Sequence, residues 1–102
     1  MGTLQYGYKG RHYDFDDRTL IHLRIVIIDK LRRHESFTLS FSTNSPRGEV
    51  RETLWLNPSI PIRFSIDDLD QNLTLNRTWI EQLARTAANG DMKLTSEPDR
   101  TS

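Results

Sequence analysis

The sequence predicts a single α+β domain in which an antiparallel sheet carries one long and one shorter helix, with elements in the order ββαβββαβ. A long segment without Gly or Pro repeats its apolar residues with a helical period, and several short segments alternate apolar with polar residues. A chain of 102 residues with 35% hydrophobic content fits one core. We expect the domain to span residues 1–95 and residues 96–102 to form a disordered C-terminal tail.

Two short strands are expected first. Residues 4–8 alternate apolar and small or polar side chains, and Gly10 closes a turn at residues 9–10. Residues 11–15 then read as the returning strand, with Tyr13 and Phe15 facing the core. This pair is predicted to form a hairpin that leads into the long helix.

Residues 17–34 are expected to form that helix. On a helical wheel, an apolar arc of about half the circumference contains Leu20, Ile21, Leu23, Ile25, Ile27, Ile28 and Leu31. Apart from Val26, the opposite side is polar and contains Arg18, Thr19, His22, Asp29, Lys30 and Arg33. Asp16 or Asp17 can cap the N-terminus, and the cations of residues 30–34 suit the C-terminal end of the helix dipole. A buried strand is the competing interpretation, because residues 25–28 are rich in β-branched side chains, but length and end signals favour the helix.

Arg24 interrupts the apolar arc. A guanidinium in that position must extend to water, pair with a carboxylate or contact a partner. Extension to water or an internal ion pair is the simpler interpretation, because long cationic stems often cover apolar surface.

Three further strands are expected at residues 36–42, 49–56 and 62–66. A loop at residues 43–48 and a break at residues 57–61, which contains two prolines, separate them. The side chains predicted to face inward are Phe37, Leu39, Phe41, Val50, Leu54, Leu56, Ile62, Phe64 and Ile66.

A second helix is expected at residues 75–88, capped by Thr74 or Asn76 and ended by a left-handed turn at residues 89–90. Its apolar stripe contains Trp79, Ile80, Leu83, Ala84 and Ala87. A last short strand is expected around Met92 and Leu94.

Composition excludes several classes of function. With 14 basic and 14 acidic residues, the formal net charge is zero, so no global field points to nucleic acid or to an anionic membrane. The absence of cysteine excludes disulfides, Cys-ligated zinc, iron–sulfur clusters and a thiol nucleophile. The N-terminus lacks a signal sequence and no apolar run approaches roughly 18 residues, so a soluble, cytoplasmic protein without membrane contact is expected.

No metal or cofactor site is predicted. Asp68, Asp70 and Asn72 match the first, third and fifth positions of a calcium loop, but Leu73 and Trp79 occupy positions that require Gly and a bidentate Glu. A solvated acidic loop near a helix N-terminus explains these charges.

No catalytic residue is predicted either. The three histidines lack the spacing that would place two imidazoles on one helix face, and no nucleophile elbow or phosphate-binding loop occurs. Carboxylates could still meet in space, but the sequence selects no pair. We therefore do not expect an enzyme.

Two stretches are candidates for binding a partner. One is the basic end of the long helix, and the other is the segment at residues 55–61, where an aromatic residue adjoins a rigid proline-containing stretch. Helix-dipole complementation and a simple turn between strands are the structural alternatives. The candidate partner-binding residues are Lys30, Arg32, Arg33, Arg51, Trp55, Pro58, Pro61 and Arg63.

Four stretches of the sequence are distinctive, namely MGTLQYG, DDRTLIHLRIVIIDKLRRHESFTLSF, TLWLNPSIPIRF and LNRTWIEQLARTAANG. They resemble a family of small, functionally uncharacterised actinobacterial proteins that often carry the automatic label ATP-dependent DNA ligase. A ligase of this kind needs a K-x-D-G lysine to accept the adenylate, and Lys9, Lys30 and Lys93 all lack that context. The chain is also too short for both domains of such an enzyme, so no functional residue is carried over.

These observations favour a non-enzymatic interaction module. Its partner is another protein or a second copy of the chain, because the apolar arc of the long helix is wider than one contact needs. The alternative is a DNA-associated accessory protein that contacts phosphates through Arg32, Arg33, Arg51 and Arg63.

Overall fold

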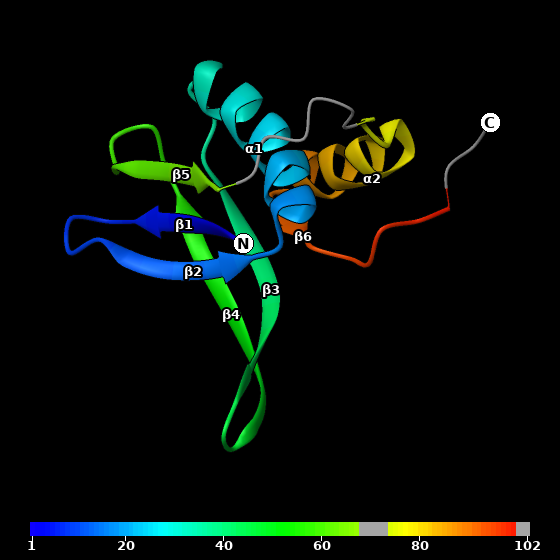
Figure 1. The fold of residues 1–102 in the computed structure, drawn as a ribbon. Helices are drawn as coiled ribbons and strands as arrows, with labels where there is room; N and C mark the ends of the chain where they lie inside the picture. The colour runs from blue at the N-terminus through cyan, green and yellow to red at the C-terminus, as the bar shows by residue number, and fades with distance from the viewer. Residues whose placement is uncertain (68–73, 100–102) are drawn as a thin grey trace.

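The computed structural model describes residues 1–67 and 74–99. The elements are β1 (Gly2–Tyr6), β2 (Arg11–Phe15), α1 (Asp17–Arg32), β3 (Phe37–Ser45), β4 (Gly48–Leu56), β5 (Ile62–Ile66), α2 (Arg77–Ala88) and β6 (Asp91–Lys93). This order confirms the α+β class and the sequence ββαβββαβ (Figure 1). Within the described ranges, no helix is long and apolar enough to cross a membrane.

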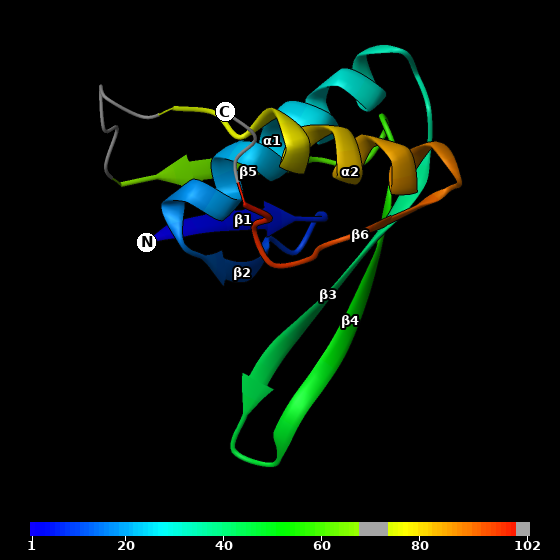
Figure 2. The same cartoon turned by 90° about the vertical axis from the view of Figure 1, so that its right-hand side faces the viewer.

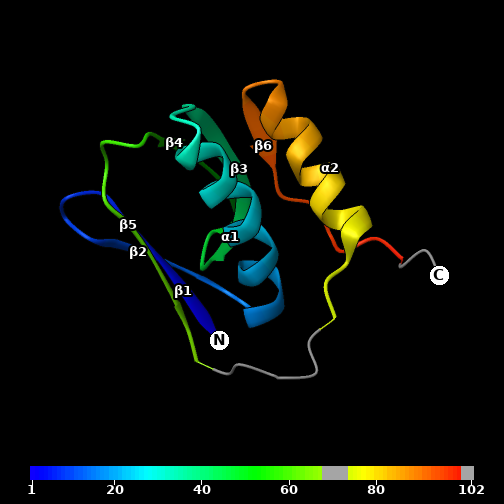
Figure 3. The same cartoon turned by 90° about the horizontal axis from the view of Figure 1, so that it is seen from above.

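The strands are divided between two three-stranded sheets. In the first sheet, β1 lies between β2 and β5, and both pairings are antiparallel, with Leu4 opposite Tyr13 and Phe64. In the second sheet, β3 is antiparallel to β4 and parallel to β6, which places Leu39 opposite Leu54 and Met92. Seen from above in Figure 3, α1 and α2 run side by side, and α1 packs against the first sheet while α2 packs against β6 and β3.

Both helices begin at an expected cap. The Asp16 carboxylate accepts a hydrogen bond from the Thr19 N–H at 3.1 Å, and the Asn76 side-chain oxygen accepts one from the Trp79 N–H at 3.2 Å. α1 ends at Arg32, two residues earlier than expected, because His34 adopts a left-handed conformation with φ of 60°.

The turn after α2 explains why β6 runs parallel to β3. Asn89 caps the helix, and Gly90 has a φ of 94°, a conformation that favours glycine. The Gly90 carbonyl accepts hydrogen bonds from the Thr38 N–H at 2.9 Å and from its hydroxyl at 3.1 Å. The chain therefore enters β6 already aligned with the start of β3, as the expected left-handed turn allows.

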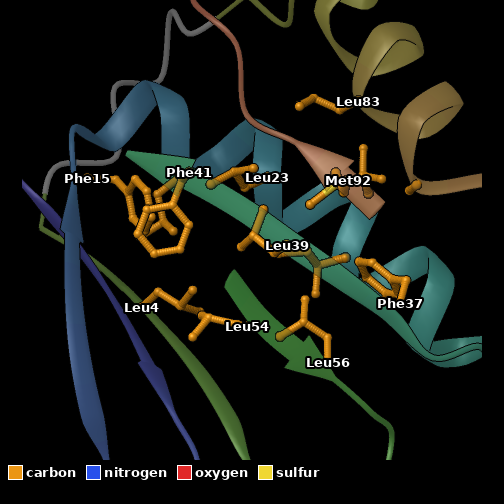
Figure 4. Packing of buried hydrophobic residues seen from close by; sticks show 14 of the residues in the cluster. Leu4, Phe15, Leu23, Phe37, Leu39, Phe41, Leu54, Leu56, Leu83 and Met92 are labelled. Carbon is orange, nitrogen blue, oxygen red and sulfur yellow. The ribbon is translucent and has the colours of Figure 1, made fainter. Parts of the chain in front are cut away.

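The core lies between the two sheets and α1, and it extends to α2 through Leu83 and Met92 (Figure 4). The rings of Tyr13 and Phe15 both make edge contacts with Phe41, with centroids 5.5 and 5.2 Å apart. The buried hydrophobic residues are Leu4, Phe15, Leu20, Leu23, Val26, Ile27, Phe37, Leu39, Phe41, Leu54, Leu56, Trp79, Leu83, Ala87 and Met92.

The buried face of α1 differs from the expected arc. His22, Val26 and Lys30 were placed on the polar side, but all three are buried, whereas Ile25 is 36% exposed. The prediction was wrong because α1 packs against the first sheet and also against α2, where the His22 ring lies 4.8 Å from the Trp79 ring. The buried face thus keeps Leu20, Leu23 and Ile27 of the predicted arc and extends from them to residues that the wheel placed on the polar side.

The β3–β4 hairpin is longer than expected. Its strands continue through most of the predicted loop at residues 43–48, and the far end extends away from the rest of the protein (Figure 2). Among the described strands, residues 42–45 and 48–51 pair only with each other. Val50 belongs to the same strand face as Leu54 and Leu56 but is 38% exposed, so the prediction that it is buried was wrong, because the core does not reach this part of the hairpin.

The segment after β6 is anchored at Glu97. Its carboxylate forms an ion pair with Arg18 of α1 and accepts a hydrogen bond from the Asn76 side chain at 2.9 Å. Asn76 also donates to the Pro98 carbonyl at 2.9 Å. The expected tail at residues 96–102 is therefore held at Glu97 and Pro98, and residues 100–102 lie outside the described residues.

Candidate functional site

A groove of about 860 Å³ lies between α1 and α2. Its apolar lining consists of Ile21, Ile25, Val26, Ile28, Ile80, Ala84 and Ala88. Its charged lining consists of Arg24, Asp29, Lys30, Arg32, Arg33 and Glu35. We call this surface the helix groove.

Helical spacing produces the two walls of the helix groove. On α1, residues at intervals of four and three positions form a row along one side of the helix, namely Ile21, Ile25 and Ile28. On α2, residues four positions apart form a matching row, namely Ile80, Ala84 and Ala88. The two alanines are exposed, and their small side chains leave space for another backbone to approach.

Most charges at the C-terminal end of α1 neutralise one another. Lys30 Nζ lies 3.0 Å from Glu35 Oε1, and Arg33 Nη2 lies 2.8 Å from Asp29 Oδ2. Arg33 Nε lies 3.2 Å from Glu35 Oε2. These four residues form a connected network of ion pairs, so Lys30 and Arg33 are already engaged within α1 and the link that follows it.

Arg24 and Arg32 differ from this network. Both are exposed, and neither makes an ion pair or hydrogen bond with another residue in the described ranges. They leave the helix groove with an excess of two positive charges. Arg24 therefore extends to water, as the simpler interpretation of its position expected, and it does so on the wall of an apolar groove.

The segment at residues 55–61 forms a separate surface that two tyrosine hydroxyl groups hold in place by hydrogen bonds. Trp55 is 54% exposed, and Pro58 and Pro61 are also exposed. Tyr6 donates to the Trp55 carbonyl, and Tyr8 donates to a carbonyl within the segment at 3.0 Å. None of the residues in this segment lines the helix groove.

Arg51 and Arg63 lie on different sheets. Arg51, on β4, is paired with Ser42 of β3. The pKa of Asp91 lies below its usual value, mainly because the Thr38 hydroxyl donates a hydrogen bond to its carboxylate. The positive charges of Lys93 and Arg51 lower this pKa further. Arg63, on β5, lines a hollow of about 180 Å³ together with Pro61. The structure thus groups Lys30, Arg32 and Arg33 in the helix groove and places the other predicted binding residues elsewhere.

His22 has a structural role. It is fully buried, its Nε2 accepts a hydrogen bond from the Asn76 N–H at 2.9 Å, and its Nδ1 lies 2.7 Å from the Arg18 carbonyl. Because Nε2 is the acceptor, the proton must be on Nδ1. The ring therefore connects α1 to the N-terminus of α2.

Within residues 1–67 and 74–99, no group of three His, Asp or Glu side chains is arranged to hold a metal ion. Asp68, Asp70 and Asn72, which resemble part of a calcium loop in sequence, lie outside the described residues.

The sequence prediction identified only part of the helix groove. It included Lys30, Arg32 and Arg33 but omitted Arg24 and the isoleucine and alanine rows. A signal was present, because the predicted apolar arc of the long helix was wider than a single packing contact requires. The relative position of the two helices could not be inferred from the sequence.

Comparison with curated proteins and with solved structures finds no match. A protein-family model described as "Domain of unknown function (DUF7882)" matches residues 1–97. This range contains both helices, every strand named above and Glu97. The chain belongs to the DUF7882 family.

Proposed function

We propose that the protein is a non-enzymatic interaction module that binds a helical segment of a partner protein in the helix groove. The observation that carries this proposal is an open groove with an apolar floor on an otherwise well-packed domain. Exposed apolar surface that is hollowed and bordered by charge is typical of protein-binding sites.

The shape of the walls favours a helix as the bound segment. The apolar row on α1 extends over roughly 10 Å and that on α2 over roughly 12 Å, about two helical turns each. An amphipathic helix places apolar side chains at the same spacing and can lay them between two such rows. Ala84 and Ala88 would allow its backbone to come close to α2.

The DNA-associated alternative has weaker support. Of the arginines expected to contact phosphates, Arg33 is already paired with Asp29 and Glu35, and Arg51 and Arg63 lie on different sheets. The apolar floor of the helix groove offers nothing to a phosphate backbone. The ligase label of the resembled actinobacterial family adds no residue to this alternative, because no lysine has the K-x-D-G context.

A peptide-display selection tests the proposal. A library of amphipathic helical peptides is selected on the native protein and counter-selected on Ala84→Trp, which places a bulky ring in the helix groove. Glu81→Trp is the matched control, since it adds the same side chain to an exposed position of α2 that does not line the groove. We expect enriched peptides to bind the native protein and Glu81→Trp but not Ala84→Trp.

Backbone NMR shifts of the labelled protein then locate the contact. Shifts concentrated in residues 21–33 and 80–88 support the proposal. Peptides that bind Ala84→Trp equally well, or shifts confined to residues 55–61, would contradict it. Tight binding of duplex DNA that falls steeply with salt and is weakened by Arg32→Ala would favour the DNA-associated alternative instead.

A further inference from the structure

We propose that the helix groove selects an acidic amphipathic helix, whose carboxylates pair with Arg24 and Arg32. This inference rests on the proposed function and adds the chemical class of the partner. It follows from the charges that remain unpaired around the apolar floor and from their positions along α1.

The two arginines are placed to contact a bound helix at two points. On a helical projection, Arg32 continues the isoleucine row one turn beyond Ile28, and Arg24 borders the same row. Their backbone positions are separated by roughly 12 Å along the axis of α1. A helix lying in the groove could therefore meet them with carboxylates about two turns apart.

The other charges of the groove cannot replace this pairing. Asp29 and Glu35 are held by Arg33 and Lys30, so they do not neutralise Arg24 or Arg32. A guanidinium bordering an apolar surface gains from a carboxylate partner that arrives together with apolar side chains, because these side chains partly shield the pair from water. A basic or neutral helix of the same shape would lack this contribution.

Charge also argues against a second copy as the occupant. In a two-fold contact through the helix groove, each protomer would present the same surface to its partner. Arg24 and Arg32 of both protomers would then lie in one interface with no free carboxylate from either groove lining. Like charges in that arrangement oppose association.

Three synthetic peptides test the inference. Each has about 18 residues and the same leucine stripe, and they differ only at two flanking positions two turns apart, which carry Glu, Gln or Lys. We expect the Glu peptide to bind about threefold to tenfold more tightly than the Lys peptide at low salt. The ratio should shrink at about 0.5 M salt, because the pairs remain partly exposed.

Matched double variants locate the effect. Arg24→Ala with Arg32→Ala should bring the Glu-to-Lys affinity ratio close to one. Arg11→Ala with Arg77→Ala removes two other exposed arginines that do not line the groove, and the ratio should remain. Circular dichroism and thermal unfolding confirm that each variant is folded.

The outcomes separate this inference from the proposed function. If all three peptides bind equally in the groove, helix docking stands and the preference for an acidic partner is overturned. A preference that persists without Arg24 and Arg32 also overturns it. If none of the peptides binds, both proposals fail together. A dimer that Ala84→Trp abolishes would replace the acidic partner with a second copy.

Discussion

Arg18 of α1 and Glu97, which lie 79 residues apart in the chain, form a two-pronged ion pair. Arg18 Nε lies 2.6 Å from Oε1 of the carboxylate, and Nη2 lies 2.8 Å from Oε2. Oε2 also accepts from the side chain of Asn76, the residue that caps α2. The carboxylate therefore ties the segment after β6 to both helices, and the bond from Arg18 is the main cause of its pKa of about 2, compared with an ordinary value of 4.5.

Glu97→Gln should destabilise the protein in a pH-dependent way. Because the pKa of Glu97 is lowered on folding, its contribution is complete above about pH 4.5 and is lost as the pH falls toward 2. Since both side chains are partly exposed, we expect a loss of about 1–2 kcal/mol at neutral pH. Urea unfolding across this pH range should show the native and variant curves converging in acid.

Glu81→Gln, the same change on the exposed side of α2, is the control for the Glu97 experiment and should have little effect. A constant stability difference between native protein and Glu97→Gln from neutral pH down to pH 2 would contradict the proposed role of the ion pair.

His22→Phe should destabilise the connection between the helices. Phenylalanine can keep the contact with the Trp79 ring, but it cannot accept the hydrogen bond from the buried Asn76 N–H. We expect a loss of about 1–3 kcal/mol in the free energy of unfolding. His12→Phe, at an exposed position of β2, should change the free energy of unfolding by less than about 0.5 kcal/mol. Equal effects in the two variants would be inconsistent with this account.

Leu39→Ala and Val50→Ala should differ strongly although they lie on neighbouring strands of one sheet. Leu39 is fully buried between β4 and β6, so its truncation should cost about 2–5 kcal/mol. Val50 is 38% exposed, and its truncation should cost less than about 1 kcal/mol. Denaturant unfolding of both variants measures this difference, and a comparable loss would mean that the core extends further along the hairpin.

Replacing both unpaired arginines by leucine should make the protein self-associate. Arg24→Leu with Arg32→Leu enlarges the apolar surface of the helix groove and removes its positive charge. Sedimentation equilibrium should show stronger association than for the native protein, whereas Arg11→Leu with Arg77→Leu should not have this effect. Unchanged association of the groove variant would show that these arginines do not control contacts there.

Local sequence patterns predicted the strands well where a strand has one solvent-exposed face and one buried face. Phe37, Leu39 and Phe41 are buried as expected, because alternation in a strand assigns every second side chain to the same face. The same argument failed at Val50, because alternation predicts a face but not whether the core reaches that far.

The helical wheel was less reliable for α1, because this helix packs against both the first sheet and α2. His22 is buried only because the Asn76 N–H, 54 residues away, satisfies its ring nitrogen. Lys30 is buried because Glu35 neutralises its ammonium group. Neither partner can be inferred from periodicity, so both residues were assigned to the wrong face.

The candidate site was predictable in part. The excess width of the apolar arc and the position of Arg24 already indicated a surface with more than one contact. The helix groove itself depends on where α2 lies, which no local pattern specifies. The anchoring of Glu97 likewise depends on Arg18 at the opposite end of the chain.

The projecting end of the β3–β4 hairpin has a consequence for hydrogen exchange. Because residues 42–45 and 48–51 bond only to each other among the described strands, they can fray without disturbing the layers behind them. Amide protons there should exchange with solvent through local openings, whereas those around Leu39 should exchange only through global unfolding. One pair of strands thus contains a labile and a protected half, and Phe41, held by two aromatic rings of β2, marks the boundary between them.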